Sequence, residues 1–187
     1  YFKGKGVLFS KNDIVVYESN NTKTNIKSKN IVIATGSAVA SLPGIEINEK
    51  NIVSSTGALS FEKVPKKLAV IGGGYIGLEM GSVWSRLGSD VTVVEYLDFI
   101  TPGMDREISN EFQKILTKQG IKFKMGSKVE SVNDQGKSVL VSYTDVKSSK
   151  KEALEVDKVL VSVGRKPYTE GLNLSKVGIK KDSKGRI

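Results

Sequence analysis

The chain has 187 residues, with 29 Lys and Arg against 20 Asp and Glu, a net charge of +9, and neither cysteine nor histidine. These absences exclude a disulfide scaffold, a cysteine-ligated metal and thiol chemistry within this chain, and remove the commonest general base and metal ligand. We therefore expect no metal site, and no apolar run approaches the roughly 18 residues that a membrane span needs.

The basic residues are scattered and often lie beside turns. Nucleic-acid binding would favour a continuous basic stripe with interleaved aromatic residues, which the sequence lacks. We therefore expect solvated surface lysines and no nucleic-acid partner, although a basic nucleic-acid binder remains an alternative.

Residues 1–34 alternate apolar and polar side chains between turn residues, which predicts a β-meander. It ends in an apolar return strand over Ile31 to Ile33 that runs into the turn Thr35-Gly36-Ser37. A strand of this kind belongs inside a sheet, yet the chain offers few partners for it. Together with the first residues, Tyr1 to Gly4, this predicts a fragment excised from a larger fold.

A connector through Asn51 follows, and Ser54 to Thr56 can cap a short helix over Gly57 to Phe61. We place a domain boundary near residues 45–50.

The central stretch is a buried strand, Leu68 to Ile71, followed by a glycine pattern. Gly72, Gly74 and Gly77 fit G-x-G-x-x-G at the start of a helix. In this pattern the first glycine permits a tight turn, the second lets the backbone approach a pyrophosphate, and the third allows close helix–strand packing. The free N–H groups and the helix dipole would face the phosphates.

The surroundings of this motif support a dinucleotide site. A helix over Tyr75 to Leu87 precedes a second strand, Val91 to Val94, which ends on Glu95. Glu95 lies about 20 residues after the glycines, where an acid accepts the ribose 2′-OH of NAD. The alternative is a plain βαβ unit with an unrelated acid at the strand end.

After Glu95 we expect a loop and a helix capped by Asp105, with Ile108, Phe112, Ile115 and Leu116 on one face. A third parallel strand over 121–124 and an antiparallel excursion over 129–132 and 139–143 follow. Residues 159–164 return to the buried sheet. The fold class is therefore α/β: a Rossmann-like NAD-binding domain over 46–170, preceded by a β-meander over 1–45 and followed by a segment over 171–187.

Several stretches together fit one family. The chain resembles the middle of the flavoprotein disulfide reductases, and most closely the dihydrolipoamide dehydrogenases. The matching stretches are Ile33 to Ser37, Val70 to Glu79, Val91 to Glu95, Asp157 to Pro167, and Gly171-Leu172.

The resemblance implies a role for each matching residue. The diphosphate of NAD would rest on the segment Gly72, Gly73, Gly74, Tyr75, Ile76 and Gly77. Glu79 and Gly164 would lie at the nicotinamide end, Glu95 would bind the adenosine ribose, and Val129 would line the adenine. The resemblance also implies that residues 1–45 are the remnant of a split FAD domain and that residues 171–187 lead back towards it. Thr35, Gly36 and Ser37 would contact FAD in the parent protein. Read without the resemblance, Glu79 is an acid favoured by the helix dipole, Val129 is a core residue, and Thr35-Gly36 is a strand-end turn.

The cofactor choice has a separate physical argument. Glu95 places a negative charge where NADP carries its 2′-phosphate, and Tyr96 to Met104 contain no arginine to neutralise that phosphate. We therefore expect NAD rather than NADP.

The chain lacks the redox cysteine pair, the first FAD-binding glycine motif and the acid/base pair of the family, so no catalytic residue is predicted and FAD is not expected to be retained. The resemblance implies a parent that oxidises protein-bound dihydrolipoamide through a redox disulfide and FAD, with hydride transfer to NAD⁺. It also implies a homodimer within a 2-oxo-acid dehydrogenase complex, in the bacterial cytoplasm or the mitochondrial matrix. Another NAD-linked disulfide reductase and a non-catalytic NAD-binding module remain alternatives.

Overall fold

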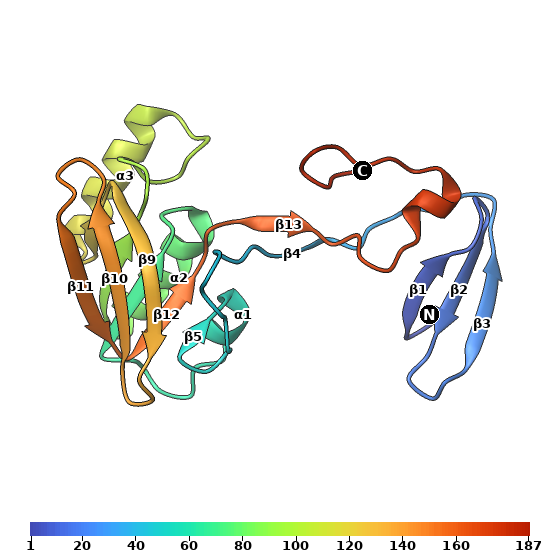
Figure 1. The fold of residues 1–187 in the computed structure, drawn as a ribbon, viewed down its shortest axis with the longest axis horizontal. Coiled ribbons are helices and arrows are strands. Elements are labelled where there is room, and N and C mark those ends of the chain that lie inside the picture. The colour runs from blue at the N-terminus through green and yellow to red at the C-terminus, as the bar shows by residue number, and fades with distance from the viewer. The chain divides into compact units, whose positions relative to one another are not determined.

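The computed structural model describes residues 1–187, which form two compact units (Figure 1). One unit comprises residues 39–164, and the other comprises residues 1–38 and 165–187. These limits fall a few residues before the expected boundaries at 45/46 and 170/171. The assignment of the units to an NAD domain and an FAD domain remains a proposal.

The larger unit is built on a five-stranded parallel sheet in the order β5-β12-β6-β7-β8. Its strands are β5 (Ile52–Val53), β6 (Lys67–Ile71), β7 (Asp90–Val94), β8 (Lys122–Lys124) and β12 (Lys158–Val161). The central strands are continuous apolar runs because both faces of the sheet are covered. This arrangement confirms the predicted Rossmann-like α/β fold.

Alternate residues of the central strands enter two separate cores. Leu68 and Val70 of β6 pack with the helices on one face of the sheet. Ala69 and Ile71 pack on the opposite face, against buried residues of an antiparallel sheet. That second sheet has the order β11-β10-β9 and consists of β9 (Ser127–Asp134), β10 (Val139–Asp145) and β11 (Lys151–Val156). The expected excursion is confirmed, and β11 adds a third strand to it that was not predicted.

Three helices cover the other face: α1 (Ser55–Ala58), α2 (Tyr75–Arg86) and α3 (Arg106–Lys118). Helix α1 begins two residues earlier than predicted because the Ser54 hydroxyl caps it by accepting from Thr56 N. Asp105 caps α3, as predicted, by accepting from the N–H groups of Glu107 and Ile108.

The predicted apolar face of α3 is only partly correct. Leu116 is buried, whereas Ile108 and Ile115 are 55% and 50% exposed. The buried side of the helix instead includes Ser109, which is 1% exposed. The core-facing stripe is therefore rotated away from the two isoleucines.

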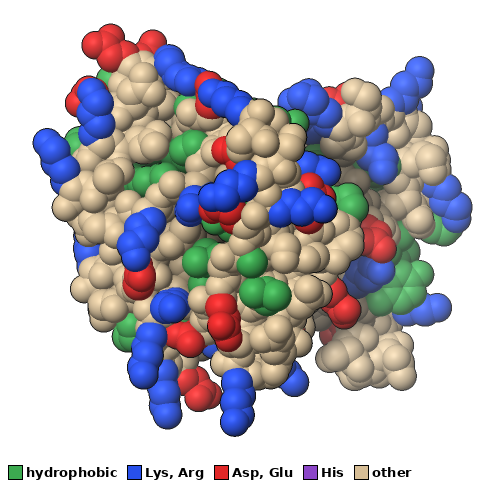
Figure 2. Space-filling model, turned by 60° about the vertical axis from the view of Figure 1, so that its left-hand side comes forward, with side chains coloured by type: hydrophobic (Ala, Val, Ile, Leu, Met, Phe, Trp, Pro, Cys, Tyr) green, Lys and Arg blue, Asp and Glu red, His purple; other side chains and the backbone are tan.

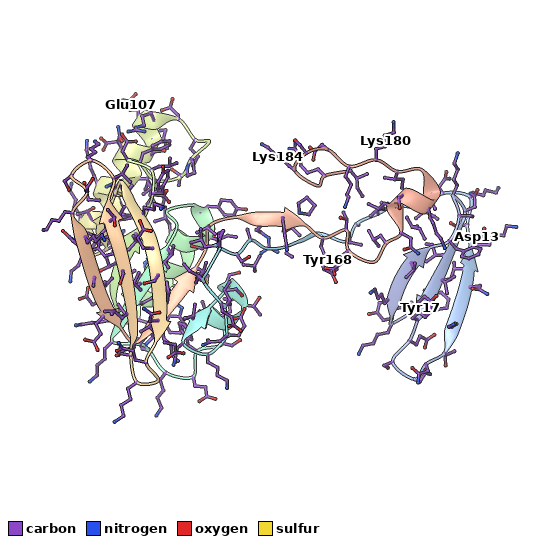
Figure 3. The ribbon with its side chains drawn as sticks, viewed as in Figure 1. Asp13, Tyr17, Glu107, Tyr168, Lys180 and Lys184 are labelled. Carbon is purple, nitrogen blue, oxygen red and sulfur yellow. The ribbon has the colours of Figure 1, made fainter.

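The smaller unit contains the predicted antiparallel meander of β1 (Lys5–Leu8), β2 (Asp13–Tyr17) and β3 (Lys23–Lys27). Figure 3 shows Asp13 and Tyr17 on β2, and the Lys23 ammonium lies 5.4 Å from the centroid of the Tyr17 ring. Strands β4 (Ser37–Val39) and β13 (Arg165–Pro167) pair with each other, and a short 3₁₀ helix, η1, spans Leu174–Val177.

The predicted return strand over Ile31 to Ile33 is wrong. No strand lies between β3 and β4, and Val32 is 88% exposed. A strand needs hydrogen-bonding partners on at least one side, and none of the other strands of the chain pairs with this stretch.

Candidate functional site: a glycine-rich turn at the switch point of the sheet

The carboxyl end of β6 lies at the switch point of the parallel sheet. The chain leaves β6 through α2 to reach β7 on one side, whereas β12 flanks β6 on the other side. Ligands of open α/β sheets bind in the crevice that such a reversal creates outside the carboxyl ends of the strands. The glycine-rich turn Gly72 to Gly74 occupies this place.

The first and third glycines of the motif are required by the fold itself. Gly72 has φ +106°, and a Cβ at this position would lie 2.6 Å from the Ser162 carbonyl oxygen. A Cβ on Gly77 would collide with the Gly72 carbonyl oxygen and would lie 3.0 Å from Val70 Cγ1. These contacts let α2 approach β6 and β12 more closely than any side chain would permit.

Gly74 is different, because nothing in the chain requires a glycine there. Its φ of −77° and ψ of 174° are ordinary extended values, and an added Cβ would meet no atom within 4 Å. Gly74 is the N-cap of α2 and provides no side-chain cap, so the N–H groups of the first turn lack side-chain acceptors. The open space beside this backbone fits a ligand group that approaches the helix N-terminus.

Glu95 follows β7 and reaches back to the turn. Its side chain is buried, at 8% exposure, and one carboxylate oxygen accepts the Gly73 N–H at 2.5 Å. The other oxygen accepts the Leu97 N–H at 2.8 Å. Its backbone is held between the Lys124 carbonyl and the Ser127 N–H, at 2.9 and 2.8 Å. The carboxylate is therefore preorganised beside the glycines before any ligand binds.

Comparisons with known proteins show the family of the chain. A family profile described as pyridine nucleotide-disulphide oxidoreductase matches residues 2–187. The chain belongs to this family.

Curated members of the family match the whole chain. The dihydrolipoamide dehydrogenase of Chaetomium thermophilum is 56% identical, covering 100% of this chain and 37% of that protein. The mitochondrial dihydrolipoyl dehydrogenase of Pisum sativum is 52% identical with the same coverage, and a leghemoglobin reductase of Glycine max is 52% identical over 36% of its length. The chain thus spans a little over a third of these relatives.

Solved structures support the fold. The HOCl-induced flavoprotein disulfide reductase RclA from Escherichia coli has a TM-score of 0.83 and 29% identity, covering 97% of this chain and 40% of that one. LpdA from Mycobacterium tuberculosis has a TM-score of 0.86 at 24% identity, which supports the fold alone.

The other residues expected to bind NAD also lie in the larger unit, residues 39–164. Tyr75 and Glu79 are exposed on α2, and Ile76 is half-buried. Val129 is half-buried on β9 and packs against the core. Gly164 is exposed with φ +131°, and its carbonyl accepts the Ala40 N–H at 3.0 Å. Their roles in binding stay predictions.

Thr35, Gly36 and Ser37 lie in the smaller unit. The Thr35 hydroxyl donates to the Tyr168 carbonyl at 2.5 Å, and the Gly36 carbonyl accepts the Tyr168 N–H at 3.0 Å. The Arg165 guanidinium donates to the hydroxyl and carbonyl oxygens of Ser37, both at 2.6 Å. Together with Lys166, Thr169 and Arg186 they line a hollow of about 370 Å³. Contact with FAD stays a prediction for this stretch.

Sequence reasoning missed two residues that hold the glycine-rich turn. Ser162 follows β12, and its hydroxyl lies 3.1 and 3.3 Å from the carbonyl oxygens of Ile71 and Gly72. Thr101 lies in the loop after β7, and its N–H donates to the Gly73 carbonyl at 2.8 Å. A serine at a strand end and a threonine in a loop carry no periodicity or motif signal. Their separation from the glycines along the chain hides these contacts.

A charged cluster ties the two sheets of the unit together away from the glycines. The Glu152 carboxylate accepts from Lys124 Nζ at 2.9 Å, Lys150 Nζ at 3.0 Å and the Tyr143 hydroxyl at 2.9 Å. These donors, with the Lys124 ammonium first among them, lower the pKa of Glu152 to about 2. Burial raises the pKa of Tyr143, and the bond to Glu152 raises that of Lys124.

The chain contains no group of three or more acidic side chains placed to hold a metal ion. None of its helices has the length and apolar character that crossing a membrane requires. Figure 2 shows basic side chains spread over the face that it draws, with acidic side chains among them.

Proposed function

We propose that this chain is the NAD-binding portion of a dihydrolipoamide dehydrogenase. The observation that carries the proposal is Gly74, whose extended backbone and open surroundings give the fold no reason for a glycine. A dinucleotide diphosphate does supply a reason, because it must approach the backbone N–H groups directly. The similarity to dihydrolipoamide dehydrogenases over the whole chain supports the choice of enzyme.

In the proposed site the protein binds and orients the nucleotide. The N–H groups at the start of α2 face the diphosphate, and the Glu95 carboxylate accepts from the adenosine ribose. Both carboxylate oxygens already hold backbone N–H groups, but each carboxylate has about four lone-pair positions and can accept further hydroxyl donors. Val129 borders the adenine, and Glu79 and Gly164 lie towards the nicotinamide.

NAD is preferred over NADP because of the charge at the ribose. A 2′-phosphate beside Glu95 would place two negative charges together in a buried environment. The nearest arginine in the following sequence, Arg106, is already engaged: it pairs with Asp98 at 3.3 Å and stacks on the Phe99 ring at 4.1 Å. The loop from Tyr96 to Asp105 itself contains no basic residue that could neutralise a 2′-phosphate.

Bound NAD⁺ would supply the hydride acceptor of the reaction. The chain itself holds neither cysteine nor histidine, so the redox disulfide, the flavin site and the acid/base pair would come from other parts of the protein. We propose a homodimeric parent that oxidises protein-bound dihydrolipoamide within a 2-oxo-acid dehydrogenase complex. The mitochondrial matrix is the favoured compartment, since relatives from Pisum sativum, Arabidopsis thaliana and Caenorhabditis elegans are named mitochondrial.

A second candidate is an NAD-linked disulfide reductase with another substrate. The structural match to RclA, a flavoprotein disulfide reductase, favours it. Both candidates require the same nucleotide site, and activity of the whole protein towards dihydrolipoamide compared with other thiols separates them.

The binding experiment is a titration of the chain with NADH and NADPH followed by nucleotide fluorescence. We expect NADH to bind more tightly than NADPH, and Gly74→Val to abolish NADH binding because its side chain occupies the diphosphate space. Gly6→Val is the matched control, since a Cβ at Gly6 meets only Ile14 at 3.8 Å in a strand outside the site. Unchanged NADH affinity in Gly74→Val would place the nucleotide elsewhere.

A further inference from the structure

Gly73, the middle residue of the turn Gly72 to Gly74, is held at both of its polar backbone groups. Its N–H donates to the Glu95 carboxylate at 2.5 Å, and its carbonyl accepts the Thr101 N–H at 2.8 Å. Ile100, the neighbour of Thr101, also packs on Gly73: a Cβ there would lie 3.2 Å from Ile100 Cγ2. The loop after β7 therefore closes on the glycine-rich turn from one side.

The bond to the Gly73 carbonyl sets the direction of the next N–H group. All peptide bonds of the chain are trans, and the C=O and N–H of a trans peptide point in opposite directions. With the Gly73 carbonyl directed at Thr101, the N–H of Gly74 points away from Thr101. It has no hydrogen-bond acceptor within the chain, and Gly74 borders open space.

Thr101 makes this contact from an unfavourable backbone conformation. Its φ is +50°, which is uncommon for a β-branched residue, and it is 4% exposed. Such conformations persist only where the surroundings enforce them, and they concentrate at functional sites. The Thr101 hydroxyl pairs with the Ser109 hydroxyl, with 2.8 Å between Oγ1 and Oγ, which fixes the side chain in place. Ser109 is itself buried on α3, so the helix anchors the loop.

We propose that Thr101, anchored by Ser109, is a positioning residue for nucleotide binding: it orients the Gly73–Gly74 peptide so that the Gly74 N–H faces the diphosphate. This inference rests on the proposed NAD site and adds a residue that touches no nucleotide atom. The alternative is that the hydroxyl pair only holds the loop against α3. Its loss would then lower stability without changing the orientation of the Gly73–Gly74 peptide.

The test compares variants that cut the hydroxyl pair with variants that keep it. Thr101→Val is nearly isosteric and removes the hydroxyl, and Ser109→Ala removes the same bond from the helix side. Thr101→Ser retains the hydroxyl. Thr117→Val is the matched control, since its hydroxyl bonds the Gln113 carbonyl at 2.8 Å at the far end of α3. Each variant is made in the whole 187-residue chain, and its thermal unfolding is recorded beside the binding data.

Two readouts are used. In the NADH titration we expect Thr101→Val and Ser109→Ala to bind about tenfold more weakly, the size of effect that a single misdirected hydrogen bond to a charged group produces. Thr101→Ser and Thr117→Val should stay within about twofold of the wild type. In nucleotide-free protein, the ¹H–¹⁵N resonance of Gly74 should shift in Thr101→Val and Ser109→Ala and remain in place in the other two.

The outcomes separate the two proposals. A wild-type chain that binds no NADH overturns the proposed function and, with it, this inference. In a second outcome the wild-type chain binds NADH, while Thr101→Val or Ser109→Ala binds it with equal affinity and leaves the Gly74 resonance unmoved. That result overturns this inference alone. An equal loss of affinity in Thr101→Ser also overturns it, because the hydroxyl would then not be the cause. If Thr101→Val fails to fold, Ser109→Ala decides the question.

Discussion

The Glu95 carboxylate accepts the Gly73 N–H at 2.5 Å across the carboxyl edge of the parallel sheet. One buried acid thereby fixes the shape of the glycine-rich turn and holds a negative charge at the expected ribose position. The two tasks are coupled, because changing the charge also changes the acceptor of the Gly73 N–H. A substitution at Glu95 should therefore alter both nucleotide choice and the turn.

Glu95→Gln should weaken NADH binding and narrow the preference for NADH over NADPH. The amide keeps one acceptor oxygen but loses the charge that repels a 2′-phosphate. Fluorescence titrations with both nucleotides measure the ratio of affinities, and Glu130→Gln on the exposed side of β9 is the control. An unaltered ratio would remove Glu95 from the ribose site.

Gly77→Ala should destabilise the larger unit by about 1–3 kcal/mol, the usual cost of forcing extra atoms into a packed site. The added Cβ meets the Gly72 carbonyl oxygen, which is backbone and cannot rotate away. Gly81→Ala, four residues along the same helix, is the control: its Cβ would meet only ordinary contacts at 3.4 and 3.6 Å. The control should be neutral or up to about 1 kcal/mol more stable because alanine favours the helix.

Chemical denaturation followed by Trp84 fluorescence measures both glycine variants. Trp84 is the single tryptophan of the chain and is buried on α2 against Phe61, with 5.1 Å between the ring centroids. Equal stability of Gly77→Ala and Gly81→Ala would contradict the tight approach of α2 to β6.

Asp105→Ala should lower the free energy of unfolding by about 1 kcal/mol, since the N-cap of α3 loses its acceptor for two backbone N–H groups. Asn110→Ala on the exposed face of the same helix should change it by less than about 0.5 kcal/mol. Thermal unfolding by circular dichroism compares the two. Because α3 carries Ser109, Asp105→Ala also tests whether fraying of the helix start reaches the nucleotide site.

Stability should fall in acid partly through Glu152. Its pKa in the folded chain is about 2, below the ordinary 4.5, so its contribution is complete above pH 4.5 and is lost as the pH falls towards 2. Glu152→Gln should therefore be less stable than the wild type at neutral pH and show a flatter decline over that window. Urea unfolding at a series of pH values measures this, and parallel curves for the two proteins would argue against the cluster.

The centre of the fold could be predicted because local patterns and tertiary packing agree there. The apolar run of β6, the glycines and the periodicity of α2 each need only neighbours that the same βαβ unit provides. The predicted return strand over Ile31 to Ile33 was wrong for the opposite reason. Its apolar character predicts a strand, but a strand depends on partners that local sequence does not reveal. Ile108 and Ile115 were wrongly predicted to face the core because apolar periodicity does not reveal that Ser109 is buried on α3, where its hydroxyl bonds that of Thr101. The contacts of Thr101 and Ser162 with the turn could not be predicted, since they join residues distant in sequence and end on backbone carbonyl groups, which carry no sequence signal.

Strand β12 lies between β5 and β6 in the parallel sheet but is the last of the five strands to be synthesised. Ile71 at the end of β6 and Ser162 directly after β12 are 91 residues apart in sequence, yet they are hydrogen-bonded neighbours at the carboxyl edge of the sheet. During synthesis β5 has no partner and one edge of β6 stays bare until residue 161 has been made. Pairings of such long range form slowly, and open strand edges are prone to aggregation meanwhile. Ribosome-bound chains that stop before β12 should therefore be sensitive to proteases, and protection should arise abruptly once this last central strand emerges.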